Sequence, residues 1–241
     1  MQYFFDTVET IPEGVGISLF GGLHLVWLAV FVLFCLGMTF FYRKASEKNQ
    51  KKIRIAFFVL LWLDEFWKMY GLIAHGNYLF DYLPLHLCSI NIFLITYHAF
   101  RPSKLLDNYL YTVGIPGAMA ALLFPSWTAL PAANFMHWHS FTVHILLAAY
   151  PLVLTLSGKI KPDYRMIPKC LGLLIAMAIP VYLINLLLDT NFMFLMEAEP
   201  GNPLYIFETM WGSHLLGFPV IIAGVLLVMH LPPYLMQKRG K

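Results

Sequence analysis

The sequence predicts an all-α membrane protein, a single transmembrane helical domain over residues 1–241 that forms a polytopic bundle of seven helices. Hydrophobic residues make up 59% of the chain and charged residues only 12%, whereas a soluble domain carries about 25% charged residues. Apolar runs long enough to cross the hydrocarbon core as helices, about 20 residues each, occur seven times. Alternating ten-residue segments, the pattern of a membrane β-barrel, are absent from the sequence.

The predicted helices follow these apolar runs in chain order. Each run is too long for a buried strand. They span approximately 18–42, 53–75, 79–100, 105–124, 139–157, 167–188 and 211–231.

The basic residues alternate with the predicted helices and so indicate an orientation. Every lysine and arginine except Lys68 falls after the first, third or fifth helix or in the C-terminal tail. The N-terminus and the other three connections hold none. Because basic residues favour the cytoplasmic side, this alternation predicts that the N-terminus lies outside and the C-terminus lies in the cytoplasm.

Polar side chains inside the predicted helices gather at one depth, in the outer half of the bundle. Charged groups in hydrocarbon are costly and suggest function, so a common cavity near the outer leaflet is a hypothesis. The alternative for Asp64 and Lys68 is structural, because their i, i+4 spacing lets them neutralise each other. The group comprises Asp64, Glu65, Lys68, His86, Cys88, His137, His139, His144, Asn185, Glu208 and His214.

Other residues fit a purely structural interpretation. Cys35 and Cys170 are expected to be small apolar packing residues. Four histidines near helix ends are expected to be interfacial, and four small residues of the fourth helix are expected to allow close helix packing. The histidines are His24, His75, His98 and His230. The small residues are Gly114, Gly117, Ala118 and Ala121.

The surroundings of Cys88 set it apart from the other two cysteines. Pro84 should open or kink the third helix and free backbone groups nearby. His86 is two residues from Cys88 and points away from it on a helix, so a base for the thiol would come from another helix. His144 matches Cys88 in depth, Ser140 shares the face of His144, and His139 is rotated off that face. A Cys–His pair across two helices would provide the thiolate that a nucleophile needs.

Several segments resemble a known family, the YwaF-like bacterial integral membrane proteins. The stretch from Leu83 to Ile90, which contains Pro84, His86, Cys88 and Ser89, resembles that family's signature, and weaker resemblances follow in order along nearly the whole chain. These are Gly114 to Pro125, Ser140 to His144, Asn185, and Asn191 to Leu195. The family is related to eukaryotic transmembrane acyltransferases that build ether-linked phospholipids. It is more remotely similar to androgen-induced membrane hydrolases of fatty-acid esters, which use a Thr nucleophile with a His.

The resemblance implies a Cys88 nucleophile and a His144 base that transfer acyl groups between membrane phospholipids or lysolipids at the outer leaflet. With water as acceptor the same site would be a lipase. An oxyanion hole is also needed, from backbone groups near Pro84 or from Asn91. The chain reads Glu199-Pro200 where the family has Lys-Pro, which places a headgroup-binding role of that loop in doubt. The loop, about 189–210, is either a lid over the cavity or an interfacial segment.

Two other classes of function remain open. A proton-coupled transporter or ligand-binding membrane protein would use Asp64, Glu65, Lys68 and the histidines as a relay. A zinc site from His86, His137, His144, His214 and Glu208 lacks a paired ligand motif. Retinal is not expected without a lysine in the last helix, nor haem without matched histidine pairs. We expect no cofactor, no metal and no nucleic-acid partner, and the plasma membrane as location if the source is bacterial. The expected supporting residues are His86, Asn91, His139, Ser140, Glu65, Lys68, Asn185 and His214.

Overall fold

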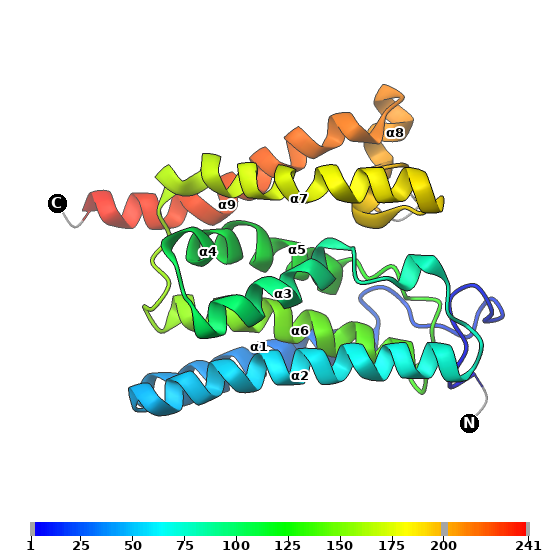
Figure 1. Ribbon diagram of the computed structural model, residues 1–241, viewed down its shortest axis with the longest axis horizontal. Coiled ribbons are helices and arrows are strands. Elements are labelled where there is room, and N and C mark those ends of the chain that lie inside the picture. The colour runs from blue at the N-terminus through cyan, green and yellow to red at the C-terminus, as the bar shows by residue number, and fades with distance from the viewer. Residues whose placement is uncertain (1–2, 199–201, 240–241) are drawn as a thin grey trace.

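The computed structural model describes residues 3–198 and 202–239, and this part of the chain is helical, with no β-strand (Figure 1). The α-helices are α1 (Gly22–Lys44), α2 (Glu47–Ala74), α3 (Leu87–Phe100), α4 (Lys104–Tyr109), α5 (Ile115–Leu123), α6 (Phe135–Leu156), α7 (Ile167–Leu188), α8 (Tyr205–Trp211) and α9 (Gly217–Arg239). Short 3₁₀ turns are η1 (Phe80–Tyr82), η3 (Tyr164–Met166), η4 (Phe192–Phe194) and η5 (His214–Leu216), and η2 (Leu110–Gly114) is a π-helical turn.

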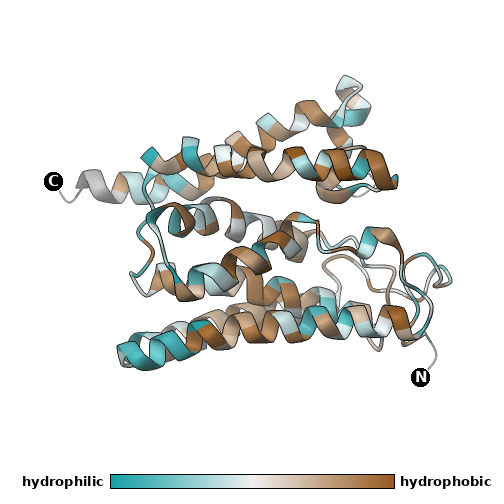
Figure 2. Ribbon diagram, viewed as in Figure 1, coloured by the Kyte–Doolittle hydropathy of each residue, from teal (hydrophilic) through white to brown (hydrophobic). Residues whose placement is uncertain are grey.

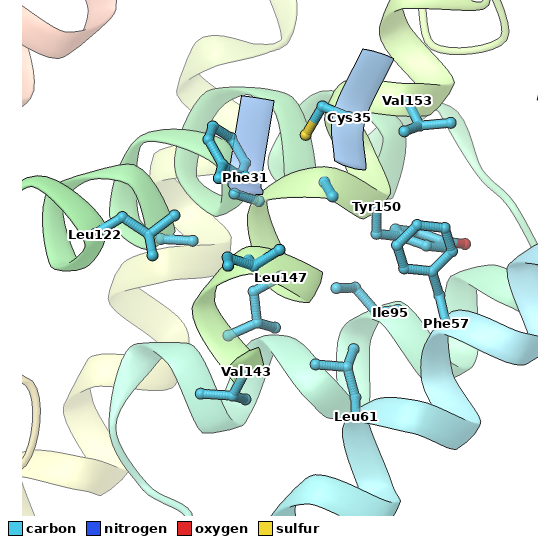
Figure 3. Packing of buried hydrophobic residues seen from close by; sticks show 14 of the residues in the cluster. Phe31, Cys35, Phe57, Leu61, Ile95, Leu122, Val143, Leu147, Tyr150 and Val153 are labelled. Atoms are coloured by element: carbon cyan, nitrogen blue, oxygen red, sulfur yellow. The ribbon is translucent and has the colours of Figure 1, made fainter. Parts of the chain in front are cut away.

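Helix α6 is the centre of the bundle. It packs against α1, α2, α3 and α5, and its buried side chains form one continuous apolar core with theirs. Figure 3 shows part of this core, in which Val143, Leu147 and Tyr150 of α6 lie among side chains of the neighbouring helices. Helices α7, α8 and α9 form a separate layer on the far side of α4 and α5 (Figure 1).

Each predicted helix range is helical over most of its length, and five helical segments are long and apolar enough to cross a membrane. These segments are Gly22–Lys44, Phe80–Phe100, Phe135–Leu156, Tyr164–Leu188 and His214–Leu235. The other two predicted spans differ from the five in character. α2 carries Asp64, Glu65 and Lys68 in its apolar part, and the segment 104–123 is divided by the π-helical turn η2.

Helix α2 begins six residues earlier than predicted. Its N-cap is Ser46 and its first residue is Glu47, so only Ala45 and Ser46 connect it to α1. The basic residues expected in a loop therefore lie on the last turn of α1 and the first turns of α2. Ser at an N-cap and Glu in the first turn both favour a helix start at this point.

Helix α3 begins eight residues later than predicted, at Leu87 rather than at 79. Residues 80–82 form the turn η1, and residues 83–86 form a further turn that ends at the N-cap His86, with φ −64° and ψ 154°. The cause is Pro84, because a proline pushes the residue before it out of the helical region. Cys88 consequently lies in the first turn of α3 rather than in its middle.

The π-helical turn η2 bends the fourth segment and anchors the last helix. The hydroxyl of Tyr111 donates a 2.5 Å hydrogen bond to the carbonyl oxygen of Met229 in α9, and the Thr112 hydroxyl lies 3.0 Å from His230 Nε2. A π turn inserts an extra residue into a helix, and these two side chains of the turn contact α9. The small-residue face predicted beyond it is confirmed for the α5–α6 contact, since Ala118 is buried against α6.

The two ends of the bundle differ in charge. The α1–α2, α3–α4 and α6–α7 connections lie at the same end, which we call the basic end (Figure 1); the start of α2 there is the hydrophilic end of that helix in Figure 2. At the opposite end, the N-terminal segment 3–21 covers the bundle. Its backbone carbonyls accept hydrogen bonds from Asn77 and Asn134, and the Glu9 carboxylate accepts one from the Tyr82 hydroxyl.

The interpretation of the cysteines is confirmed, and that of the helix-end histidines is mostly wrong. Cys35 and Cys170 are buried in apolar clusters. His24, His98 and His230 are buried rather than interfacial, and only His75 is exposed. Each buried ring satisfies a polar group from a distant segment. His24 bonds the Leu122 carbonyl oxygen, His98 lies between Tyr150 and Asp107, and His230 bonds Thr112.

Candidate functional site

Two buried charges of α2 form an ion pair beside the start of α3. Lys68 Nζ lies 2.5 Å from Glu65 Oε1, and both side chains are buried. Lys68 also donates a 3.4 Å hydrogen bond to the Tyr82 carbonyl oxygen. The predicted neutralisation of Lys68 by Asp64 is therefore wrong. Glu65 takes that role because at i, i+3 it lies on the buried face of the helix, whereas Asp64 is turned toward α6.

Asp64 pairs instead with α6. Its Oδ2 lies 3.3 Å from His139 Nδ1, and the Thr142 hydroxyl lies 3.1 Å from each carboxylate oxygen. The His139 contact has the distance of an ion pair without hydrogen-bond geometry. Asp64 and Thr142 also line an otherwise apolar groove of about 500 Å³ between α1, α2 and α6. His139 thus faces away from His144, as the helical spacing predicts.

Cys88 lies in the first turn of α3, among backbone donors that the helix does not use. His86 is the N-cap, and the first helical bond runs from the Ile90 N–H to the His86 carbonyl oxygen. The N–H groups of Leu87, Cys88 and Ser89 have no backbone partner within the described residues. The Ser89 N–H and hydroxyl both interact with the Cys88 sulfur. A helix N-terminus of this kind favours negative charge.

His144 is held in a defined tautomer within α6. Its Nδ1 lies 2.6 Å from the Ser140 carbonyl oxygen. A carbonyl oxygen only accepts, so Nδ1 carries the proton and the lone pair of the neutral ring is on Nε2. The ring also stacks on Trp127, with centroids 5.1 Å apart and planes 15° apart. Ser140 thus contributes through its backbone and not through its hydroxyl.

Electrostatic interactions join these groups into one cluster, which we call the Cys88 cluster: Glu65, Lys68, His86, Cys88 and His144. Lys68 and Glu65 both lie near enough to Cys88 to act on its charge, and Lys68 and His144 act on His86. Cys88 and His144 form no hydrogen bond within the described residues, so their pairing as nucleophile and base stays a prediction.

Asn185 connects the end of α7 to the Cys88 cluster through the loop that follows it. The buried Asn185 amide accepts hydrogen bonds from the Phe192 N–H and the Thr190 hydroxyl and donates one to the Phe192 carbonyl oxygen. The next residue, Met193, donates its N–H to His86 Nδ1 at 3.3 Å. The loop therefore contacts His86 at the start of α3. The Glu199-Pro200 departure lies outside the described residues.

Two expected supporting residues are less closely connected with Cys88. Asn91 is buried one turn along α3, and its Oδ1 has no hydrogen-bond partner within the described residues. His214 lies at the junction of α8 and α9, where its N–H and Nδ1 each lie 2.8 Å from Glu208 Oε2. These bonds hold the pKa of the Glu208 carboxyl below its usual value. Among residues 3–198 and 202–239, no group of three or more His, Cys, Asp or Glu side chains could hold a metal ion.

Sequence reasoning missed several contacts of the cluster. Trp127 comes from the connection before α6 and Tyr82 contributes a backbone carbonyl, so neither carried a signal in the sequence. Ser89 was visible beside Cys88, and its significance depends on the late start of α3. Phe192 and Met193 lie in the segment from Asn191 to Leu195 that carries the family resemblance, and nothing in that segment indicates a contact with His86.

The five segments that are long and apolar enough to cross a membrane define the class of this protein, a multi-pass integral membrane protein of helical type. The chain belongs to the TMEM164 family, whose model matches residues 19–230. No curated protein matches the chain. No solved structure matches it either.

Proposed function

We propose that this protein is a Cys-His-dependent lipid acyltransferase that acts in the outer half of the membrane. The observation that carries the proposal is the position of Cys88, at an open helix N-terminus beside Lys68 and next to His86, on which His144 acts. A cationic neighbour and unpaired N–H groups both favour the thiolate that a nucleophilic cysteine requires.

In the first step, His144 Nε2 accepts the proton of the Cys88 thiol, and the sulfur attacks the ester carbonyl of a donor phospholipid. The carbon–oxygen ester bond breaks, and His144 returns the proton to the departing lysolipid alkoxide. The acyl group is then held on Cys88 as a thioester. In the second step, the hydroxyl of an acceptor lysolipid gives its proton to His144 and attacks the thioester. The acyl group leaves on the acceptor, and the thiol is restored with the proton from His144.

The oxyanion of both steps needs fixed hydrogen-bond donors. The N–H groups of Cys88 and Ser89 are oriented by the first turn of α3 and have no backbone partner within the described residues. Donors of this kind typically contribute 10²–10³-fold to the rate each, as a rough guide. Of the two sources expected from the sequence, backbone groups near Pro84 and the side chain of Asn91, this arrangement favours the backbone groups.

We further propose seven spans, with the N-terminus outside and the C-terminus in the cytoplasm. The segments α2 and 104–123 would complete the five apolar spans, since each runs between the basic end and the opposite end of the bundle (Figure 1). With the basic end in the cytoplasm, the Cys88 cluster faces the outer leaflet, where donor and acceptor lipids would be reached from the bilayer.

The test is lipid mass spectrometry on purified protein in liposomes, with a phospholipid labelled in its acyl chain and a lysolipid acceptor. We expect label on the acceptor with the wild type and with Cys170→Ala, which removes a different buried thiol. Cys88→Ala should abolish transfer and His144→Ala should lower it about 10²–10⁴-fold.

Each other outcome has a defined meaning. Label only in free fatty acid would make the protein a lipase with the same residues. Unchanged transfer by Cys88→Ala would reject the cysteine mechanism. No transfer by folded wild type would favour the second candidate, proton-coupled transport, for which the contact of Asp64, at the apolar groove, with His139 is the supporting observation.

A further inference from the structure

The loop after α7 contacts His86 through one backbone hydrogen bond and two aromatic rings. We call residues 189–198 the exit loop. Within it the Met193 N–H points at His86 Nδ1 at 3.3 Å, and the rings of Phe192 and Phe194 flank the imidazole at centroid distances of 5.2 and 6.0 Å. These contacts join the end of α7 to the residue that caps α3.

The Met193 contact fixes which nitrogen of His86 carries the proton. A backbone N–H only donates, so Nδ1 must accept with its lone pair. In the neutral imidazole the proton is then on Nε2. Nδ1 cannot act as a base while the exit loop is in place, and Nε2–H is a donor.

His144 has the opposite tautomer. The Ser140 carbonyl oxygen holds the proton on Nδ1 and leaves Nε2 as the basic nitrogen. The two rings are close enough to interact electrostatically. Two histidines of one cluster are therefore set up for different tasks, one to accept a proton and one to donate a hydrogen bond.

The exit loop has a defined conformation, set by hydrogen bonds within it and to the end of α7. The Asn185 side chain makes three hydrogen bonds to Thr190 and Phe192, and Asn191 Oδ1 accepts from the N–H groups of Met196 and Glu197. Met193 has φ 60°. This left-handed backbone conformation costs free energy for residues other than glycine. The N–H of Met193 is the one that His86 Nδ1 accepts.

We propose that His86 is the side-chain donor to the oxyanion of the site and that the exit loop, through Met193, keeps it in the donor tautomer. The inference rests on the proposed acyl transfer for the identity of the oxyanion. The tautomer and its dependence on the loop can be measured without any activity. Closing the loop over His86 would thus complete the donor set formed by the first turn of α3.

The first experiment is ¹⁵N NMR of histidine-labelled protein in lipid bilayers, with the His86 signals identified by their loss in His86→Gln. We expect the Nε2–H tautomer in the wild type. Asn185→Ala, which frees the exit loop, should convert His86 to a mixture of tautomers, while Glu208→Gln at the neighbouring α8 should leave it unchanged. An Nδ1–H tautomer in the wild type, or no change with Asn185→Ala, would overturn the proposal whatever the activity.

The second experiment uses matched amides, because the Gln side chain can place an N–H₂ donor near the Nε2 position and the Asn side chain only near Nδ1. In the acyl-transfer assay, His86→Gln should keep kcat within about tenfold of the wild type. His86→Asn and His86→Ala should each lose about 10²–10³-fold in kcat with little change in KM.

Rescue by Asn rather than Gln, or an equal loss with all three variants, would reject His86 as the donor. If Cys88→Ala leaves transfer unchanged, the acyl-transfer proposal fails instead, and the NMR result still decides whether the loop sets the tautomer.

Discussion

The half of the molecule built around α6 and the layer formed by α7 and α9 differ sharply in packing. In the apolar stretch of α6, 72% of the residues are buried, against 11% in the stretches of α7 and α9. His144 belongs to the first region, where its ring is stacked and its Nδ1 is bonded. Asn185 and the exit loop belong to the second, which contacts the cluster at His86.

This difference indicates how tasks are divided between the regions. A base must keep its position and tautomer to within a few tenths of an ångström, so the packed region is suited to hold it. A segment that admits a lipid must move, and regions with few buried apolar contacts open at low cost in free energy. The loosely packed layer is therefore the expected moving part.

The largest contrast should come from truncating buried and exposed apolar side chains. Phe141 of α6 is fully buried and stacks on Trp27 with centroids 4.9 Å apart. Phe141→Ala should lower the free energy of unfolding by about 3–5 kcal/mol, measured by denaturant titration in mixed micelles. Leu183→Ala on the exposed face of α7 should change it by about 0.5 kcal/mol. Equal losses would mean that the two regions are packed alike.

Two glycines offer a subtler comparison. A Cβ on Gly71 of α2 would lie 2.5 Å from Phe135 Cε2 of α6, whereas one on Gly172 of α7 meets nothing within 4 Å. Gly71→Ala should destabilise the protein by about 1–3 kcal/mol through overpacking. Gly172→Ala should stabilise it by about 0.5–1 kcal/mol through helix propensity. The same denaturant titration tests whether the two substitutions change the free energy of unfolding in opposite directions. A stabilising effect of Gly71→Ala would contradict the tight α2–α6 contact.

The smallest effect should come from the ion pair that joins the two regions at the basic end. Lys104 Nζ of α4 lies 2.8 Å from Asp163 Oδ2, and this contact lowers the pKa of the Asp163 carboxyl. A carboxyl whose pKa is lower in the folded state stabilises the protein above its unfolded pKa of about 3.9. The contribution is lost as pH falls through the folded value.

Lys104→Met should remove that part of the pH dependence. The measurement is the thermal midpoint at pH 7 and at pH 3, where wild type and variant should differ slightly at pH 7 and converge at pH 3. A constant difference at both pH values would assign the effect of Lys104 to something other than Asp163.

The helices could be predicted well from the sequence, because apolar length and the placement of basic residues are properties of segments. α7 occupies the predicted range 167–188. Helix starts were predicted less well where local chemistry outweighs hydropathy. Leu79, Phe80 and Leu83 are as apolar as a helix requires, yet Pro84 delays α3 to Leu87. Ser46 and Glu47 begin α2 among charged residues that hydropathy assigns to a loop.

The residues of the candidate site could be identified from the sequence, but their partners could not. Lys68 has an acidic residue at both i−3 and i−4, and only the packing of α2 decides between Glu65 and Asp64. The tautomer of His144 depends on a carbonyl oxygen of its own helix, and that of His86 on a backbone N–H 107 residues away. Backbone groups carry no sequence identity, so contacts of this kind are visible only in three dimensions.

The π-helical turn at 110–114 has a consequence for how this family tolerates changes in length. One residue advances a regular helix by about 100° of rotation and 1.5 Å of rise, and the π turn absorbs one such residue. Deleting a single residue there would restore a straight α-helix through the segment. The same deletion would rotate Ala118 and Leu122 out of the α6 contact, and would release Tyr111 and Thr112 from α9. Family members in which this segment contacts α6 and α9 in the same way should keep the extra residue, whichever amino acid occupies the position.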